Sequence, residues 1–243
     1  MRETEKIMGI SIDRVNMEEA YNRFKMFMGK NKLHTIYTPN TEIIMMAQHD
    51  YELKEILNTG DLVIPDGIGL VYASKILGKQ LKERVTGVDL MTRILQYCNK
   101  EERSIFILGG KPGIAELATK NITKVFPQIE IKGVRDGYFK EEEEQCIIDT
   151  INTLEPDVLF VALGVPRQEK WINKHHLKVR VAMGVGGSID IWAGTVKRAP
   201  IFFQRLGLEW LYRLFKEPWR YRRMAVLPKF LINVIINKNR QRD

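Results

Sequence analysis

Short apolar runs alternate with amphipathic stretches along most of the chain. Runs that are apolar throughout predict buried strands at residues 33–37, 62–64, 105–108, 129–134, 158–163 and 179–183. Apolar residues spaced three and four apart predict helices at residues 16–27, 42–47, 68–77, 88–97, 114–125 and 142–154. This alternation predicts an α/β fold, in which a mostly parallel sheet carries helices on both faces.

Five of the predicted strands end in polar, glycine or proline residues. These groups are Thr38-Pro39-Asn40, Pro65-Asp66-Gly67, Gly109 to Gly113, Gly164 to Gln168 and Gly184 to Asp190. In open parallel sheets, ligands bind outside the carboxyl ends of the strands. We therefore expect all five groups to meet on one rim of the sheet.

The stretch from Val179 to Pro200 is the strongest candidate for binding an anion. A predicted strand is followed by a glycine turn, and Ser188 or Asp190 is placed to cap a helical turn. Glycines let the backbone approach a ligand closely, and a helix N-terminus presents about half a positive charge. The candidate contacts here are Gly186, Gly187 and Asp190. The same glycines also fit a tight turn that binds nothing.

A second glycine loop, Gly109-Gly110-Lys111-Pro112-Gly113, follows the strand at residues 105–108. Neither loop matches the dinucleotide fingerprint, because Ile189 stands where the loop at Gly184 would need its third glycine. Neither is a Walker loop, since no Gly-Lys-Ser/Thr occurs. A nucleotide-dependent oxidoreductase on the same fold is therefore disfavoured. Gly109 is the candidate contact in this loop, with a plain tight turn as the alternative.

Several strand-end side chains have both a chemical and an ordinary interpretation. Asp66, between Pro and Gly, is placed where a general base would be held, but Asp in such a turn commonly bonds its own backbone. Thr38 and Asn40 suit sugar hydroxyls, or else a turn and a helix cap. Arg84 and Arg167 suit two-pronged phosphate contacts, or else exposed salt bridges.

The chain changes character near Pro200. Apolar residues that predict an amphipathic helix recur at Phe203, Leu206, Trp210 and Leu214. From residue 197 onward there are twelve Lys or Arg and three acids, a surplus of nine, whereas the preceding part carries about −1 of the total net charge of +8. We expect an α/β core over residues 1–199 and a basic amphipathic appendage over residues 200–243.

An appendage that is both basic and apolar favours an anionic membrane surface or an anionic substrate over nucleic acid. Its candidate cations, which would neutralise a diphosphate or contact lipid head groups, are Arg213, Arg220, Arg222 and Arg223. The apolar stripe equally fits self-association. No apolar run approaches the roughly 20 residues that span a bilayer. We expect the chain to lie on a membrane without crossing it.

Cysteine and histidine usage bounds the compartment and the cofactors. Cys98 and Cys146 lie in segments that look helical, and the N-terminus lacks the apolar core of a signal peptide, so a reducing cytoplasm is expected. The four histidines lack metal-ligand spacing, and no Asp-x-Asp pair occurs. We therefore expect no metal and no other cofactor, so side-chain cations must neutralise any departing diphosphate.

Six motifs, in order along nearly the whole chain, resemble the WecG/TagA/CpsF glycosyltransferase family. They are TPNTE (38–42), PDGIGLV (65–71), RVTGVDL (84–90), GVPRQEKW (164–171), GVGGSIDIWAGTVKRAP (184–200) and LEWLYRLFKEPWRYRR (208–223). The resemblance is closest to the TagA branch, which makes the linkage unit of wall teichoic acid.

This resemblance implies an inverting, metal-independent transfer of N-acetylmannosamine from its UDP donor to the 4-hydroxyl of N-acetylglucosamine on undecaprenyl diphosphate. The base of the family falls on Asp66, and its pocket residues fall on Thr38, Asn40, Arg84 and Gln168. The tail arginines match its C-terminal appendage. It also implies a Rossmann-like core, self-association in solution through the appendage, and activity as a monomer on the inner face of the cell membrane.

Two alternatives stay open at this point. The residues do not distinguish N-acetylmannosamine from its uronic acid or another UDP-sugar as the donor, because any of several cations would match one carboxylate. A non-catalytic module that binds membrane or nucleic acid through the tail is the rival class.

Overall fold

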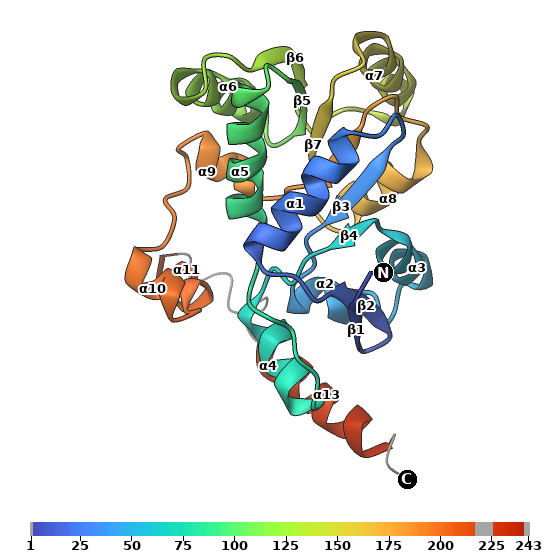
Figure 1. Cartoon of the computed structure of the whole chain (residues 1–243), viewed down its shortest axis with the longest axis vertical. Helices are drawn as coiled ribbons and strands as arrows, with labels where there is room; N and C mark the ends of the chain where they lie inside the picture. Colours follow the sequence, from blue (N-terminus) through green and yellow to red (C-terminus); the bar gives the residue numbers. More distant parts are fainter. Residues whose placement is uncertain (1, 217–225, 241–243) are drawn as a thin grey trace.

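The computed structural model describes residues 2–216 and 226–240. Within these residues, the strands of the main sheet are β3 (His34–Tyr37), β4 (Leu62–Val63), β5 (Ser104–Gly109), β6 (Glu130–Arg135), β7 (Val158–Ala162) and β8 (Val181–Gly184). All neighbouring strands are parallel, in the order β4-β3-β8-β7-β5-β6 (Figure 1). The predicted α/β fold with a parallel sheet is confirmed.

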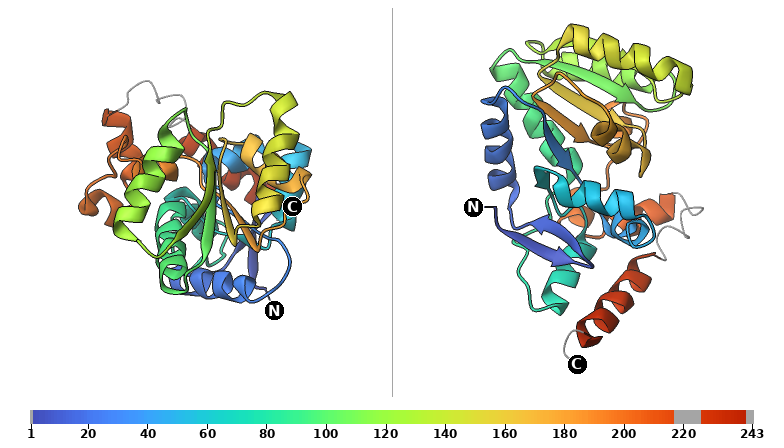
Figure 2. Two further views of the ribbon diagram at one scale, coloured as in Figure 1. Left: turned by 90° about the horizontal axis from the view of Figure 1, so that it is seen from above. Right: turned by 90° about the vertical axis from the view of Figure 1, so that its right-hand side faces the viewer.

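Helices cover both faces of this sheet, and Figure 2 shows α6 and α7 on opposite sides of it. One face packs against α1 (Met17–Met28), α5 (Gly87–Lys100), α6 (Ile114–Val125) and α9 (Ser188–Trp192). The other face packs against α2 (Thr41–Met46), α3 (Tyr51–Thr59), α7 (Glu141–Leu154) and α8 (Arg167–Lys174). Each face therefore has its own apolar cluster.

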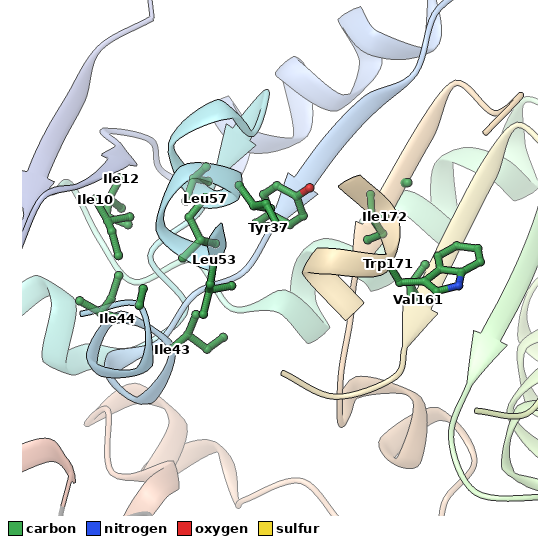
Figure 3. Close-up of a cluster of buried hydrophobic side chains, with 14 of the residues drawn as sticks. Ile10, Ile12, Tyr37, Ile43, Ile44, Leu53, Leu57, Val161, Trp171 and Ile172 are labelled. Atoms are coloured by element: carbon green, nitrogen blue, oxygen red, sulfur yellow. The ribbon is translucent and has the colours of Figure 1, made fainter. Parts of the chain in front are cut away.

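Strand β7 shows why these strands are apolar throughout. Val158 and Phe160 pack into one cluster, whereas Leu159 and Val161 pack into the other, and all four are fully buried. Successive side chains of a strand point to opposite faces, so a strand covered on both faces needs an apolar residue at every position. Figure 3 shows Val161 within the cluster that also contains Trp171 and Ile172 of α8.

The predicted cap of the first helix is confirmed. The side-chain oxygen of Asn16 accepts a hydrogen bond from the Glu19 N–H at 2.8 Å, and Glu19 Oε2 accepts one from the Asn16 N–H at 2.9 Å. This reciprocal pair satisfies two N–H groups that the helix itself leaves unpaired. It fixes where α1 begins.

The apolar pattern does not predict the N-terminal hairpin, which consists of β1 (Thr4–Ile7) and β2 (Ile10–Asp13). Its turn, Met8-Gly9, has positive φ at both residues, at 50° and 81°. Asp13 ties the hairpin to the sheet, because its Oδ2 atom accepts from the Val63 N–H at 2.7 Å and its carboxylate pairs with Arg2. The Met8-Gly9 pair between isoleucines is the sequence signal for this turn.

Candidate active site

A cleft of about 930 Å³ opens at the carboxyl ends of the parallel strands. Each of the five strand-end groups contributes to its lining, through residues such as Thr38, Asp66, Gly110, Gln168 and Gly187. The expectation that these groups meet on one rim is confirmed. Three residues of the appendage also line the cleft, namely Glu209, Trp210 and Leu227.

Asp66 is partly buried in the cleft wall, just beyond β4. Its backbone N–H donates to the carbonyl oxygen of Pro39 at 3.1 Å, which joins two of the strand-end loops. A Cβ added at Gly87, the first residue of α5, would lie 3.4 Å from Asp66 Oδ2. The carboxylate is therefore held between its own loop and the first turn of α5, where any larger residue at position 87 would crowd it.

Thr38 and Asn40 leave β3 on the same wall. The Thr38 hydroxyl donates to the carbonyl oxygen of Gly184 at 3.2 Å, so it links the ends of β3 and β8. Asn40 Oδ1 accepts from the N–H groups of Glu42 at 2.9 Å and Ile43 at 3.1 Å. The helix-cap interpretation of Asn40 is thus correct for its oxygen, and its side-chain N–H₂ group is the end suited to a ligand.

Gln168 lies one turn into the segment after β7, as the second residue of α8, and is buried. Its N–H₂ group donates to Glu169 Oε1 at 2.9 Å. Its Oε1 atom is buried and has no hydrogen-bond partner among the residues that the structure describes. A Cβ added at Gly184 would lie 3.0 Å from Gln168 Nε2, so the amide packs directly on the end of β8.

The sequence pattern does not single out Glu169, although its side chain is only 1% exposed. It stands in the polar run Arg167-Gln168-Glu169-Lys170, where no apolar periodicity marks one residue as buried. Burial raises the pKa of the Glu169 carboxyl to about 7, and the hydrogen bond from Gln168 only partly opposes this effect. A carboxyl with a shifted pKa at the cleft is a signal that only the fold provides.

Replacing Glu169 by Gln is expected to make the protein more stable at pH 8 but not at pH 4. The folded state holds the Glu169 proton more tightly than the unfolded state, whose pKa is near 4.5, so stability is lost as pH rises toward 7. The difference in unfolding free energy between variant and native protein should grow by up to about 3 kcal/mol across this range. Urea denaturation at several pH values measures it.

The exposed Glu116 supplies the control for that experiment, because it is likewise the third residue of its helix, α6. Glu116→Gln removes the same charge from a helix first turn without emptying a buried site. A stability difference for Glu169→Gln that stays constant from pH 4 to pH 8 would contradict the prediction.

The glycine turn after β8 differs in one respect from the expectation. Helix α9 begins at Ser188 with Gly187 before it, and no side chain caps it, so the predicted capping by Ser188 or Asp190 is wrong. Gly186 has a φ of 46°, which a residue with a side chain rarely adopts. Gly186, Gly187 and Asp190 all line the cleft, and a Cβ added at Gly187 would lie 3.8 Å from Asp190 Oδ2.

In the second glycine loop, the lining residues are Gly110 and Lys111. Gly109 is not one of the described residues that line the cleft. A Cβ added at Gly109 would lie 2.4 Å from the backbone of Ala162 on β7, and its φ is 129°. Packing between β5 and β7 therefore explains why this position is glycine.

Where a single helix is expected over residues 203–214, the structure has two, α10 (Ile201–Arg205) and α11 (Glu209–Lys216). Gly207 separates them with a φ of 70°. A Cβ added there would lie 2.8 Å from Ile68, the first residue of α4 (Ile68–Ile76). The turn at Gly207 thus packs closely on the core, which a continuous amphipathic helix would not do.

Arg84 lines the cleft, where it forms an ion pair with Glu209 of α11. Glu209 also accepts from Arg198 at 3.3 Å, and Arg198 makes a two-pronged contact with Asp89 of α5 at 2.5 and 2.7 Å. These ion pairs join the appendage to the core. Neither Arg198 nor Glu209 stands out in the sequence, and the phosphate contact of Arg84 stays a prediction.

The last described helix, α13 (Val226–Arg240), packs against α2 and α4 (Figure 1). Phe230 and Val234 are buried in the main apolar cluster, whereas Ile232 and Ile235 on the same helix are exposed. Leu227 at its start reaches the cleft and would lie 2.6 Å from a Cβ added at Gly69. The division of the chain at residue 199 stays a prediction.

The predicted cationic contacts of the appendage fall only partly within the described chain. Arg213 belongs to α11, whereas Arg220, Arg222 and Arg223 lie outside the described residues. No helix within residues 2–216 and 226–240 combines the length and the apolar character that crossing a bilayer requires. In the same part of the chain, no three His, Cys, Asp or Glu side chains are grouped so that they would hold a metal ion.

Three curated bacterial proteins named N-acetylglucosaminyldiphosphoundecaprenol N-acetyl-beta-D-mannosaminyltransferase are similar to this chain. The protein of Bacillus spizizenii is 40% identical over 211 residues, which cover 86% of this chain and 81% of the relative. That of Bacillus subtilis is 38% identical over 202 residues, covering 82% and 78%. That of Staphylococcus aureus is 31% identical over 232 residues, covering 94% and 91%.

The family comparison agrees with these similarities. Residues 5–243 match the Glycosyl transferase WecG/TagA/CpsF family, so the match includes both the core and the appendage. The resemblance drawn from the six sequence motifs is confirmed. With its parallel α/β sheet and strand-end cleft, this chain is a glycosyltransferase that belongs to the WecG/TagA/CpsF family.

Proposed function

We propose that the protein transfers N-acetylmannosamine from UDP-N-acetylmannosamine to the N-acetylglucosamine of undecaprenyl-diphosphate-N-acetylglucosamine, in the synthesis of the linkage unit of wall teichoic acid. The observation that carries this proposal is the meeting of Asp66, Thr38 and Gln168 with the glycine turn at residues 184–187 in one cleft. The names of the three relatives support both the transferred sugar and the lipid-linked acceptor.

In the proposed mechanism, Asp66 accepts the proton of the acceptor 4-hydroxyl as that oxygen attacks the anomeric carbon of the donor. A glycosidic C–O bond forms while the C–O bond to the diphosphate breaks, and UDP leaves with the bonding electrons. Attack on the face opposite UDP inverts the anomeric centre. Thr38, Asn40 and Gln168 hold the sugar by hydrogen bonds, and Gly109, Gly186, Gly187 and Asp190 contact the rest of the donor.

The leaving UDP gains negative charge, which cations in the cleft stabilise in the transition state. Lys111 and Arg167 line the cleft, and Arg167 is held there by a hydrogen bond to the Gly137 carbonyl oxygen at 2.9 Å and by stacking over Phe139. In the proposal these cations act on the donor with Arg84. The arginines of the appendage, Arg213, Arg220, Arg222 and Arg223, act on the diphosphates near the membrane.

The proposed site of action is the cytoplasmic face of the cell membrane, where a UDP-sugar and a lipid-linked acceptor meet. Exposed apolar residues on α10 and α11, such as Phe202 and Phe215, support contact with the bilayer by this part of the chain. Because the same residues would also support self-association in solution, we propose a homo-oligomer that gives way to the membrane-bound form.

A panel of donors tests the proposed reaction. The protein is incubated with a short-chain polyprenyl-diphosphate-N-acetylglucosamine and one UDP-sugar at a time, and released UDP is measured. UDP-N-acetylmannosamine should give the fastest release, with a disaccharide product whose new linkage is to the 4-hydroxyl. Faster release from the corresponding uronic acid or from another UDP-sugar would contradict the assignment of the donor.

Removal of divalent metal ions is expected to leave turnover unchanged. Because side-chain cations stabilise the leaving diphosphate in the proposed mechanism, a chelator takes away nothing that the reaction uses. UDP release is compared before and after treatment with EDTA, and a magnesium-dependent glycosyltransferase treated in parallel shows that the treatment works. Loss of activity that Mg²⁺ or Mn²⁺ restores would contradict metal independence.

A further inference from the structure

We infer that Glu169 is a positioning residue of the cleft, whose carboxyl orients the side-chain amide of Gln168 so that Gln168 Oε1 faces a bound sugar. The inference rests on the proposed function and adds to it a residue that itself touches no substrate. Gln168 lines the cleft, whereas Glu169 is not among the described residues that do so.

The orientation follows from the chemistry of the two side chains. A glutamine amide has two ends of nearly the same shape, one that only accepts hydrogen bonds and one that only donates them. Gln168 Nε2 lies 2.9 Å from Glu169 Oε1. At pH 8 the Glu169 carboxyl, with its pKa near 7, is mostly ionised and only accepts. A reversed Gln168 amide would set two acceptor oxygens against each other, so Glu169 selects one of the two orientations.

The selected orientation leaves the oxygen end of Gln168 available to a ligand. Gln168 Oε1 is buried and has no partner among the described residues, and a Cβ added at Gly186 would lie 3.8 Å from it. The oxygen therefore lies beside the glycine turn of the cleft. An unpaired buried acceptor is unfavourable, and a sugar hydroxyl or an N-acetyl N–H would satisfy it.

Glu169 does not pay for its burial by stabilising the fold. Its Oε2 atom has no hydrogen-bond partner, and the carboxyl forms no ion pair within the described residues. The pKa of the neighbouring Tyr37 hydroxyl is raised, first by burial and also by the charge of Glu169, and Figure 3 shows this ring directed toward α8. An apolar side chain would suit such surroundings better, so orienting Gln168 is the role that explains a carboxyl here.

Two replacements of Glu169 test this role at pH 8. With Glu169→Leu, which keeps the volume but accepts no hydrogen bond, kcat/KM for the donor is expected to fall about tenfold, mainly through a higher KM. With Glu169→Gln, which still accepts, the loss should be smaller. The urea midpoint should not fall in either variant, and Glu116→Leu at the matching position of α6 should leave kcat/KM unchanged. In a Gln168→Leu background, Glu169→Leu should cause no further loss.

A measurement without substrate separates this inference from the proposed function. The side-chain N–H₂ signals of Gln168 in a ¹H–¹⁵N spectrum are assigned with Gln168→Leu and should shift in Glu169→Leu, whichever sugar is the donor. Failure of the native protein to use UDP-N-acetylmannosamine counts against the function alone. The positioning role is overturned by unchanged Gln168 signals, by native kcat/KM in Glu169→Leu, by additive losses in the double variant, or by activity that falls only with stability.

Discussion

Asp66→Asn is expected to lower turnover by about 10²- to 10⁴-fold, the range that a general base contributes. Asn has nearly the same shape but does not take up the proton of the acceptor hydroxyl at neutral pH. Folding should be unaffected, because the contact that joins the loops uses the backbone N–H of Asp66 and the carbonyl oxygen of Pro39. UDP release with the native acceptor measures the effect, and urea denaturation confirms that the variant is folded.

The turn at Asp136 offers a matched control for Asp66. Like Asp66, it follows a strand of the main sheet and precedes a glycine, and its Oδ1 atom accepts from the Tyr138 N–H at 2.7 Å, as an ordinary turn aspartate does. Asp136→Asn should keep turnover within about twofold, since such a substitution removes one exposed hydrogen bond. If Asp66→Asn behaves like Asp136→Asn, Asp66 is a turn residue and the base lies elsewhere.

Gly109→Ala is expected to destabilise the protein by on the order of 3–5 kcal/mol. Its φ of 129° is unfavourable for alanine, and the added Cβ would lie 2.4 Å from backbone atoms of Ala162. Relief would require β5 to move away from β7 at the centre of the sheet, where the two strands are paired from Ile105 to Gly109. Urea denaturation of the two proteins measures the difference.

Gly113→Ala separates the two causes of that loss. Gly113 also has a positive φ, of 82°, but a Cβ added there meets nothing within 4 Å. Its replacement should cost only the backbone strain, about 1 kcal/mol. Equal losses at positions 109 and 113 would show that contact with Ala162 is not what requires glycine at the end of β5.

The sequence predicts the main sheet well because each of its central strands is buried on both faces. Apolar runs such as Val158 to Ala162 leave little alternative, and the polar groups after them mark the rim where the cleft forms. The N-terminal hairpin and α3 give weaker signals. Hairpin strands of four residues carry little periodicity, and the turn depends on a positive φ at Met8, which favours neither strand nor helix.

The cleft is only partly predictable, because several of its contacts join distant parts of the chain. Arg84 pairs with Glu209, 125 residues away, and no local pattern records that pairing. Glu169 is adjacent to Gln168 in sequence, but its burial results from the packing of α8 on the sheet. Asn40 could be placed at the rim, whereas the choice of its oxygen as a helix cap required the geometry of α2.

The seating of α13 affects how any shortened form of the chain should be interpreted. Phe230 and Val234 fill the main apolar cluster, and Leu227 forms part of the cleft wall. A chain ending at residue 199 would expose the α2 and α4 surfaces that these side chains cover, as well as removing the basic residues. Weak catalysis by such a truncation would therefore report a damaged sugar site together with poor bilayer affinity. Point substitutions of exposed residues on α10 would separate the two.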